Sequence, residues 1–335
     1  MTEVADQPAA VRPAVSRRRA GVRVSVPART SISVIDMNEF APGRAGGGNL
    51  GVTLDLRTVL SVRPATGDCF SSSGAGAAAD GLLRYVCERW CALTGVADPF
   101  QVTVEHAPPA HVGLGSSASL QLALWAGLNW LYGCDLSDTE LRSAVSASYR
   151  ETDQDTLVSG FTTGLSAFLN LYGGFAAIDV DLRVIFHEQL PAWHYAVAIH
   201  RDYAAVSAGE SELQTLMGRG CEYDVGAGAE KRRLIHEVAA AVRGADLVRF
   251  GNVVRELQSL GSKRAEVMLH GHGLYEVIDR LRADGTDAVF MSAVGPGLVL
   301  LSESPLQPRT AQAHGLELLA RGRVDNVGII LETLP

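Results

Sequence analysis

The stretch PAHVGLGSSAS at residues 109–119, followed directly by LQLALWAGLNWLY at 120–132, decides the fold of this chain. The second segment would be apolar on nearly every face of a helix, so it predicts a buried helix. At its N-terminus, the loop residues Gly113, Leu114, Gly115, Ser116, Ser117 and Ala118 bring free backbone N–H groups to the positive end of the helix dipole. The three hydroxyls of Ser116, Ser117 and Ser119 are predicted to converge on the same point. The sequence therefore predicts an anion-binding loop at the mouth of a core helix.

Three other interpretations compete for this loop. A glycine turn that merely caps a core helix needs one serine rather than a cluster. A Walker loop needs a Gly-Lys-Ser/Thr ending, and no lysine lies near the loop. A dinucleotide fingerprint needs a strand with a terminal acidic residue after the helix, whereas a second predicted helix directly follows Asp135. The favoured interpretation is a phosphate-binding loop that follows neither of these nucleotide motifs.

Periodic segments on both sides of the loop indicate an α+β protein with two domains. Before the loop we expect strands over 21–34, at 52–54 and over 101–105, a flexible loop over 71–81 and a helix over 82–94. After it we expect a helix over 138–151, with Ser137 as its cap, and a strand over 175–179. The predicted division is a disordered tail over 1–21, an N-terminal domain over 22–190 and a C-terminal domain over 191–335.

The succession of predicted strands and helices restarts near residue 190, where the C-terminal domain is expected to begin. Strands are expected over 195–200, 288–292, 298–302 and 327–332, and helices over 208–217, 229–243, 246–265, 273–284 and 308–321. An irregular insertion is expected over 218–228.

Composition excludes several classes of function. With 29 basic and 37 acidic residues, the net charge of −8 disfavours nucleic acid or an anionic membrane as a partner. No apolar segment reaches the roughly 20 residues of a membrane span. Five cysteines without a CxxC pair indicate neither a zinc knuckle nor a disulfide framework, so we expect a cytoplasmic protein. His270-Gly-His272 has no nearby third ligand and does not predict a metal site.

Four segments of the chain resemble the motifs of the GHMP superfamily, the group of galactokinase, homoserine kinase and mevalonate kinase. They are Pro27-Ala28-Arg29, the loop at 109–119, the segment Thr163 to Gly174, and Val294-Gly295-Pro296-Gly297. The resemblance implies a ribosomal-S5-like N-terminal domain and a ferredoxin-like C-terminal domain. It also implies that Ser166 lies where several of these kinases carry their catalytic aspartate. Because serine is not a base near neutral pH, the kinase base is missing.

Other features are similar to the branch that contains β-ribofuranosylaminobenzene 5′-phosphate synthase. Arg29 is followed by Ile35-Asp36, then by the glycines between 46 and 51, and then by His-Val-Gly-Leu-Gly-Ser at 111–116. The segment 207–210 resembles a Ser-Gly-Glu element of the same branch. This branch includes C-glycoside synthases of pyrazole C-nucleoside antibiotic pathways, and the resemblance implies an enzyme of that kind.

The resemblance implies a decarboxylating transfer of a phosphoribosyl group. A ring carbon of an electron-rich aromatic carboxylate attacks C1 of phosphoribosyl pyrophosphate, with loss of pyrophosphate and CO2. The product would be a β-ribosyl C-nucleoside 5′-phosphate. Such a reaction needs a pyrophosphate cradle and a water-poor pocket, but no strong base.

Under this interpretation the loop residues Gly113 to Ala118 hold one phosphate group, with Mg²⁺ as the expected cofactor and Ser117 as its possible ligand. Arg29, His111 and Arg201 are the expected cationic donors, and Asp36 or Asp202 would stabilise positive charge at C1. The remaining expected contacts with substrate come from Asn38, Asn49, Thr162, Thr163, Gly295 and Gly297.

Two alternatives stay open. The loop continues Ser117-Ala118-Ser119 as in the kinases, so a small-molecule kinase with ATP and a relocated base is the first. A protein that binds an anion without catalysis is the second. A homodimer is the default expectation for the assembly.

Overall fold

The computed structural model describes residues 18–37, 45–66, 70–74, 76–147, 149–153, 156–200 and 226–335. Most of the predicted tail, the helix predicted over 208–217 and nearly all of the insertion predicted over 218–228 lie outside these residues. Residues 18–21 already contact the folded body. The Arg18 backbone N–H donates to the Leu131 carbonyl at 2.8 Å, and the Arg18 guanidinium lies 4.5 Å from the centre of the Trp130 ring.

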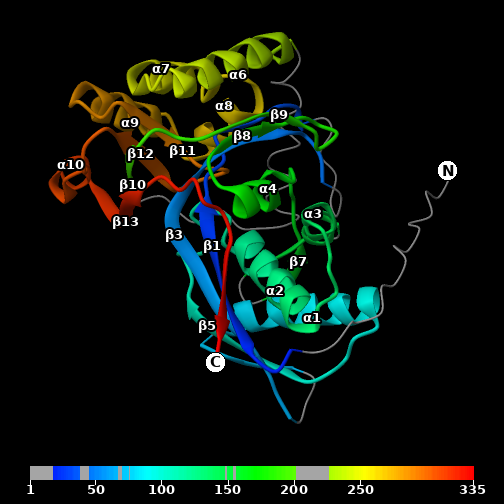
Figure 1. Ribbon diagram of the computed structural model, residues 1–335. Coiled ribbons are helices and arrows are strands. Elements are labelled where there is room, and N and C mark those ends of the chain that lie inside the picture. The colour runs from blue at the N-terminus through cyan, green and yellow to red at the C-terminus, as the bar shows by residue number, and fades with distance from the viewer. Residues whose placement is uncertain are drawn as a thin grey trace.

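An eight-stranded sheet forms the body of the N-terminal half (Figure 1). Its main path runs in the order β14 (Ile330–Leu334), β1 (Gly21–Arg29), β3 (Asn49–Pro64), β5 (Phe100–His106) and β4 (Phe70–Ser73). Strands β2 (Ser33–Val34) and β8 (Phe175–Ile178) pair with β3, and β9 (Val184–Glu188) pairs with β8. The strand β14 returns the C-terminus of the chain to this first sheet, where Leu334 pairs with Gly21.

The long strand β3 belongs to both parts of this sheet. Residues 59–64 pair with β5, whereas residues 49–52 pair with β8. The second of these regions brings the start of β3 beside Thr30 and Ile32, whose backbone N–H groups donate to carbonyls of β3. The end of β1 and the start of β3 are thus held together at one end of the sheet.

Helix α2 (Ser116–Tyr132) is the centre of the N-terminal half, as the apolar stretch predicts. It lies against β1 and β3, with α1 (Ala77–Thr94), α3 (Asp138–Ser146) and α4 (Leu165–Tyr172) around it (Figure 1). Leu122, Leu124 and Leu128 are completely buried in this helix. A small hairpin of β6 (Arg150–Asp153) and β7 (Thr156–Ser159) lies beside α1.

Leu124 offers a direct test of this core. Leu124→Ala should lower the free energy of unfolding by about 2 to 5 kcal/mol, because it leaves a cavity in a fully packed helix interface. The exposed Val248 on another helix gives the matched control, since Val248→Ala should change stability by less than about 0.5 kcal/mol. Urea unfolding followed by circular dichroism measures both, and equal effects would contradict this assignment of the core.

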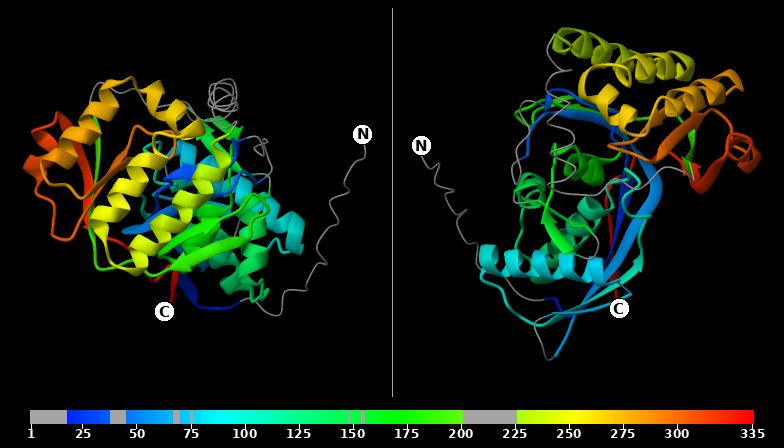
Figure 2. Two further views of the ribbon diagram at one scale, coloured as in Figure 1. Left: turned by 90° about the horizontal axis from the view of Figure 1, so that it is seen from above. Right: turned by 180° about the vertical axis from the view of Figure 1, so that it is seen from behind.

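A four-stranded antiparallel sheet forms the second half, in the order β11 (Ala288–Met291), β12 (Leu298–Ser302), β10 (His194–His200) and β13 (Leu316–Arg323). The helices of this half are α6 (Gly228–Arg243), α7 (Leu247–Leu257), α8 (Gly261–Leu269), α9 (Gly273–Ala283) and α10 (Pro308–Gln312) (Figure 2). Side chains alternate along β12: Val299 and Leu301 share a core with α6 and α7, whereas Leu298 and Leu300 share one with α8 and α9.

The two halves share a continuous core. The cluster under α6 and α7 also contains Leu50 and Val52 of β3 and Val112 before the anion loop. This contact places the loop, the end of β1 and the turn after β11 at one junction between the two sheets. The observed α+β architecture confirms the predicted fold class.

Four predicted elements differ from the structure. The loop expected over 71–81 contains most of β4 and the first turn of α1, and the helix expected over 138–151 ends at Ser146, before β6. The helix expected over 246–265 is broken between α7 and α8, where Gly261 has a φ of 52°. The helix expected over 308–321 ends as the short α10, and its second half is β13, which pairs with β10.

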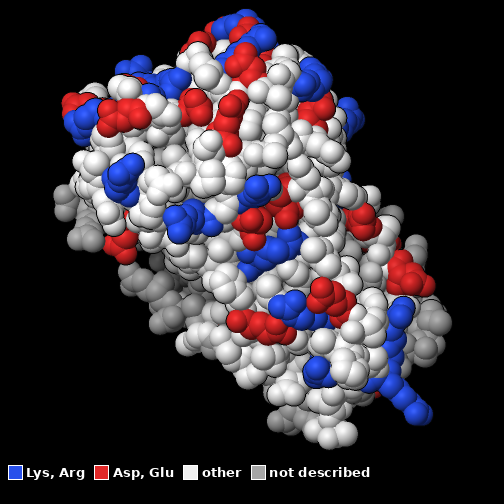
Figure 3. Space-filling view, turned by 60° about the vertical axis from the view of Figure 1, so that its left-hand side comes forward, with Lys and Arg blue, Asp and Glu red and all other residues white. Residues whose placement is uncertain are grey.

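Charged side chains of both signs are interspersed on the face shown in Figure 3, without a continuous basic area on that face. Elsewhere among the described residues, Arg233 pairs with Glu230 and Arg255 with Asp279, so charges of opposite sign lie side by side on the surface. Among the described residues, no helix is long and apolar enough to cross a membrane.

Candidate active site

The glycine-rich loop lies at the N-terminus of α2, where the sequence predicts it. Gly113 and Gly115 have φ values of 79° and 67°, and a Cβ on Gly113 would lie 2.2 Å from the Ser292 carbonyl oxygen. Gly115 is the N-cap residue of α2, and no side chain caps this helix end. The first N–H groups of α2 therefore remain available for an anion.

The three serines of the loop do not act alike. Ser116 and Ser117 are half-buried and line the pocket in front of the loop. Ser119 is completely buried, and its hydroxyl bonds Thr58 at 2.8 Å and the Ser116 carbonyl at 3.0 Å. The prediction that three hydroxyls converge on the anion is therefore wrong for Ser119, which fixes the helix to β3.

Arg29 lies directly beside the loop. It ends β1, its backbone N–H donates to the Leu114 carbonyl at 3.2 Å, and its Nε donates to Ser166 Oγ at 2.6 Å. A Cβ on Gly115 would lie 2.8 Å from Arg29 Nε. Glycine at 115 thus lets the guanidinium approach the loop, and Ser166 of α4 fixes its orientation.

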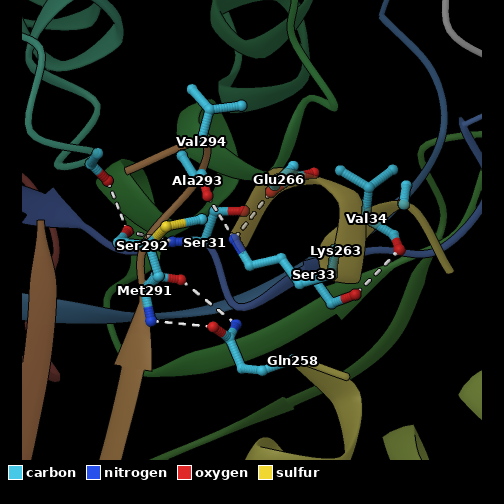
Figure 4. Close-up of polar contacts among 12 residues, drawn as sticks. Ser31, Ser33, Val34, Gln258, Lys263, Glu266, Met291, Ser292, Ala293 and Val294 are labelled. Atoms are coloured by element: carbon cyan, nitrogen blue, oxygen red, sulfur yellow. Dashed lines mark hydrogen bonds and ion pairs between the residues drawn. The ribbon is translucent and has the colours of Figure 1, made fainter. Parts of the chain in front are cut away.

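Ser292, after β11, connects three segments of the junction. Its hydroxyl accepts a hydrogen bond from the Ser31 backbone N–H at 3.0 Å and donates to the Gly113 carbonyl at 2.6 Å. Figure 4 shows it beside Ser31, with Gln258 bonded below to the Met291 backbone at 2.9 Å. The turn after β11 therefore holds both the segment that follows β1 and the anion loop in place.

Ser292→Ala tests this connection. The variant leaves the buried Ser31 N–H without its acceptor, so we expect a loss of about 1 to 3 kcal/mol in the free energy of unfolding. Because Gly113 also loses its partner, affinity for inorganic phosphate should fall about tenfold. Isothermal titration calorimetry measures the affinity. Ser302→Ala, a nearly buried serine on β12 that bonds the Ser304 carbonyl, should leave phosphate affinity unchanged. Equal phosphate affinities of the two variants would contradict the assignment.

The structure brings most of the predicted site residues to one pocket. Those that line it are Arg29, Asn49, His111, Gly113, Leu114, Gly115, Ser116, Ser117, Thr162, Thr163 and Gly295. Asn49 is buried and its Nδ2 donates to Ser31 Oγ at 2.8 Å. His111 is exposed, with a φ of 57°, and it stands at the rim of the loop.

Other predicted residues have different positions. Asp36 does not line the pocket, and its backbone N–H donates to the Gly47 carbonyl at 2.9 Å. Ala118 is buried in α2 behind the loop. A Cβ on Gly297 would lie 2.1 Å from the Val112 carbonyl oxygen, so this glycine allows two loops to approach closely. Asn38, Arg201, Asp202 and the segment 207–210 lie outside the described residues.

Sequence reasoning missed several residues of the pocket wall. They are Ser31, Val34, Met37, Tyr149, Glu151, Phe161, Glu266, Ala293 and Val294. Two of them, Glu151 and Glu266, are carboxylates. The sequence predicts a helix through Glu151, which lies instead on β6, and the i,i+3 spacing of Lys263 and Glu266 resembles an ordinary surface pair. No signal in the sequence distinguishes the half-buried Glu151 and the buried Glu266 from exposed acids.

The two halves, the buried helix and the uncapped loop give a two-part α+β chain with a candidate anion site at the junction of its sheets. Residues 77–161 match the family model described as GHMP kinases N terminal domain. Homoserine kinase from Cytophaga hutchinsonii has the same fold, with a TM-score of 0.63 over 93% of this chain and 98% of that one, at 16% identity. The chain therefore has the fold of these kinases and carries a segment that matches their N-terminal domain, in agreement with the resemblance of the motifs.

Two relatives are similar over nearly the whole chain. The β-ribofuranosylphenol 5′-phosphate synthase of Methanothermobacter thermautotrophicus is 26% identical, over 90% of this chain and 94% of its own length. The synthase of the same name from Archaeoglobus fulgidus is 25% identical, over 84% of this chain and 88% of its own length.

Proposed function

We propose that this protein is a C-glycoside synthase that couples phosphoribosyl pyrophosphate to an electron-rich aromatic carboxylic acid. Pyrophosphate and CO2 are lost, and the product is a β-ribosyl C-nucleoside 5′-phosphate. Similarity to the two synthases over most of the chain supports this proposal. A pyrazole-type acid, as in C-nucleoside antibiotic pathways, is the finer part of the proposal and follows from the branch that the motifs resemble.

The observation that carries the proposal is the contact between Arg29 and Ser166. In the kinases that the motifs resemble, the position of Ser166 holds a carboxylate that accepts a proton from the substrate. Here a hydroxyl accepts a hydrogen bond from Arg29 Nε at 2.6 Å and directs that guanidinium to the loop. The site therefore combines a fixed cation with an anion loop and has no base at this position, which suits departure of pyrophosphate rather than deprotonation of an alcohol.

The chemical step balances without a strong base. The ring carbon that carries the carboxylate supplies an electron pair to C1, and a C–C bond forms while the bond from C1 to the pyrophosphate oxygen breaks. Pyrophosphate leaves with that bonding pair. The bond from the ring to the carboxylate then breaks, its electrons return to the ring, and CO2 departs.

In this proposal, different residues of the pocket bind the pyrophosphate and the ribose of the substrate. The loop from Gly113 to Ser117, with Arg29 and His111, would bind the leaving pyrophosphate. Thr162, Thr163 and Asn49 would contact the ribose hydroxyls. Among the described residues that line the pocket, the carboxylates are Glu151 and Glu266, whereas Asp36 is not one of them.

Mg²⁺ is part of the proposal. Among the described residues no group of three His, Cys, Asp or Glu side chains could hold a metal by itself. A Mg²⁺ ion that keeps several waters needs only one or two protein ligands in addition to phosphate oxygens, and the Ser117 hydroxyl and Glu151 carboxylate suit that role. When bound, the ion would neutralise charge on the leaving group.

One assay separates the candidate functions. Purified protein is incubated with Mg²⁺, phosphoribosyl pyrophosphate and a panel of pyrazole and benzene carboxylic acids, and released pyrophosphate and CO2 are measured. Equal amounts of both, dependent on both substrates, are expected. ADP from ATP and a small alcohol, without CO2, would establish the kinase alternative. A thermal shift with phosphoribosyl pyrophosphate but no turnover would establish a binding protein.

A further inference from the structure

The only two lysines of the chain, Lys231 and Lys263, are both buried behind the pocket. Lys231 Nζ donates to the Val34 carbonyl at 3.1 Å. Lys263 Nζ donates to Glu266 Oε2 at 2.9 Å and to the Ala293 carbonyl (Figure 4). The proposed reaction does not use the charged pair formed by Lys263 and Glu266.

Glu266 differs from an ordinary partner of a buried lysine, because it also lines the pocket. Its side chain is 4% exposed, and that of Lys263 is 1% exposed. Within the described residues, Oε2 bonds Lys263, whereas Oε1 has no hydrogen-bond partner and is not sealed from the pocket. An open acceptor on a buried carboxylate is costly unless a ligand donates to it.

The surroundings of Glu266 indicate which part of a ligand would donate. Val34, Met37 and Val294 form a small apolar cluster with Leu269, which lies one turn after Glu266 on α8. Val34, Met37 and Val294 line the pocket together with Glu266. An apolar wall of this kind suits a flat ring, whereas the phosphate groups belong to the loop and Arg29.

Electrostatics supports the same assignment. Burial lowers the pKa of Lys263 below its ordinary value, the Glu266 carboxylate opposes that shift, and the charge of Arg29 adds to it. An ionised pair of Lys263 and Glu266 has no net charge, so it does not repel an aromatic carboxylate elsewhere in the pocket. It still offers one carboxylate oxygen as a strong acceptor.

We infer that Glu266 determines specificity by accepting a hydrogen bond from an N–H or O–H group on the ring of the aromatic acid. This inference rests on the proposed function. It restricts the aromatic substrate to acids that carry such a hydrogen-bond donor, either as a ring N–H or as an amino or hydroxyl substituent. Lys263 is a positioning residue, because it holds Oε2 and thereby directs Oε1 to the ring.

The test compares pairs of ligands in which methylation removes the donor, and the variants below separate the loss of the donor from the added bulk. The probes are 4-aminobenzoate against 4-(dimethylamino)benzoate, and 1H-pyrazole-4-carboxylate against its 1-methyl derivative. Binding to the full chain is measured by isothermal titration calorimetry. In at least one pair, the ligand with the donor should bind about tenfold or more tightly than its methylated counterpart. The methylated ligand leaves the charged Glu266 Oε1 without a hydrogen bond. Equal binding within both pairs, or no binding of any acid, would overturn the inference.

Variants connect this preference to Glu266. Glu266→Leu leaves Lys263 buried without its counter-charge and is expected to destabilise the fold, so the informative variant is Lys263→Met with Glu266→Leu, which removes both acceptor oxygens. The preference for the donor ligand should fall below about threefold in the double variant, while affinity for Mg²⁺-pyrophosphate stays within about twofold. Glu276→Gln on α9, an exposed acid paired with Arg280, should keep the full preference.

The outcomes separate this inference from the proposed function. A preserved donor preference in the double variant would overturn the role of Glu266, even if pyrophosphate and CO2 are released as proposed. A large loss of Mg²⁺-pyrophosphate affinity, with the donor preference intact, would assign Glu266 to the metal instead. A donor preference that depends on Glu266, without any turnover, would support the subsite and contradict the proposed reaction.

Discussion

Replacement of Arg29 by methionine should lower kcat/KM of the proposed synthase reaction by about 10²- to 10³-fold, the usual effect of removing one fixed donor to a developing negative charge. The guanidinium lies against Gly115 and is oriented by Ser166, so it lies next to the anion in the loop. Kinetics with phosphoribosyl pyrophosphate and the best aromatic acid measure the effect.

Two variants complete this experiment. Arg63→Met removes an exposed arginine far along β3, whose Nη1 donates to the Pro335 carbonyl, and it should keep kcat/KM within about twofold. Arg29→Lys keeps the charge but loses the bond to Ser166, so it should be intermediate. Activity of Arg29→Met equal to that of the Arg63 variant would remove Arg29 from the site.

Ser117→Asp should abolish turnover, with a loss above about 10³-fold, because a carboxylate in the loop repels phosphate in a partly dehydrated site. The fold should survive, since an acidic residue in the first turn of a helix interacts favourably with its dipole. Ser117 is only half-buried, which also favours an intact fold. Turnover, affinity for pyrophosphate and the urea midpoint are measured on the same preparation.

Ser117→Ala is the matched control for this variant. It removes the hydroxyl without adding charge and should reduce turnover by about tenfold or less. Unchanged activity of Ser117→Asp would show that the loop is not part of the active site.

The sequence predicts the central helix and its loop well, because a stretch that is apolar on every face has few structural alternatives. It fails at β13, where Leu316, Glu317, Leu318, Leu319 and Ala320 all favour a helix. Pairing of that segment with β10 overrides its local preference. The helix predicted to reach 151 ends early for a similar reason, since Arg150 and Glu151 pair with β7.

The sequence predicts some residues of the site and misses others. Residues within contiguous motifs, such as Arg29 and the loop, are recognisable by their order. Lys263 and Glu266 come from a helix of the second half that only the shared core brings to the pocket. Asp36 is predicted from its place after Pro27-Ala28-Arg29, but it does not line the pocket, although Val34 and Met37 of the same segment do. Long-range packing determines these positions, and no local pattern encodes it.

The bond formed at C1 tests the central proposal most directly. Phosphoribosyl pyrophosphate labelled with ¹³C at C1 is incubated with Mg²⁺, the protein and an aromatic acid labelled with ¹³C at the ring carbon that carries the carboxylate. We expect a product whose ¹³C spectrum shows one-bond coupling between the two labelled carbons, with release of one CO2 per product. A product that joins C1 to oxygen or nitrogen and retains the carboxylate would contradict the proposal, as would phosphorylation of a small alcohol by ATP without any ribosyl product.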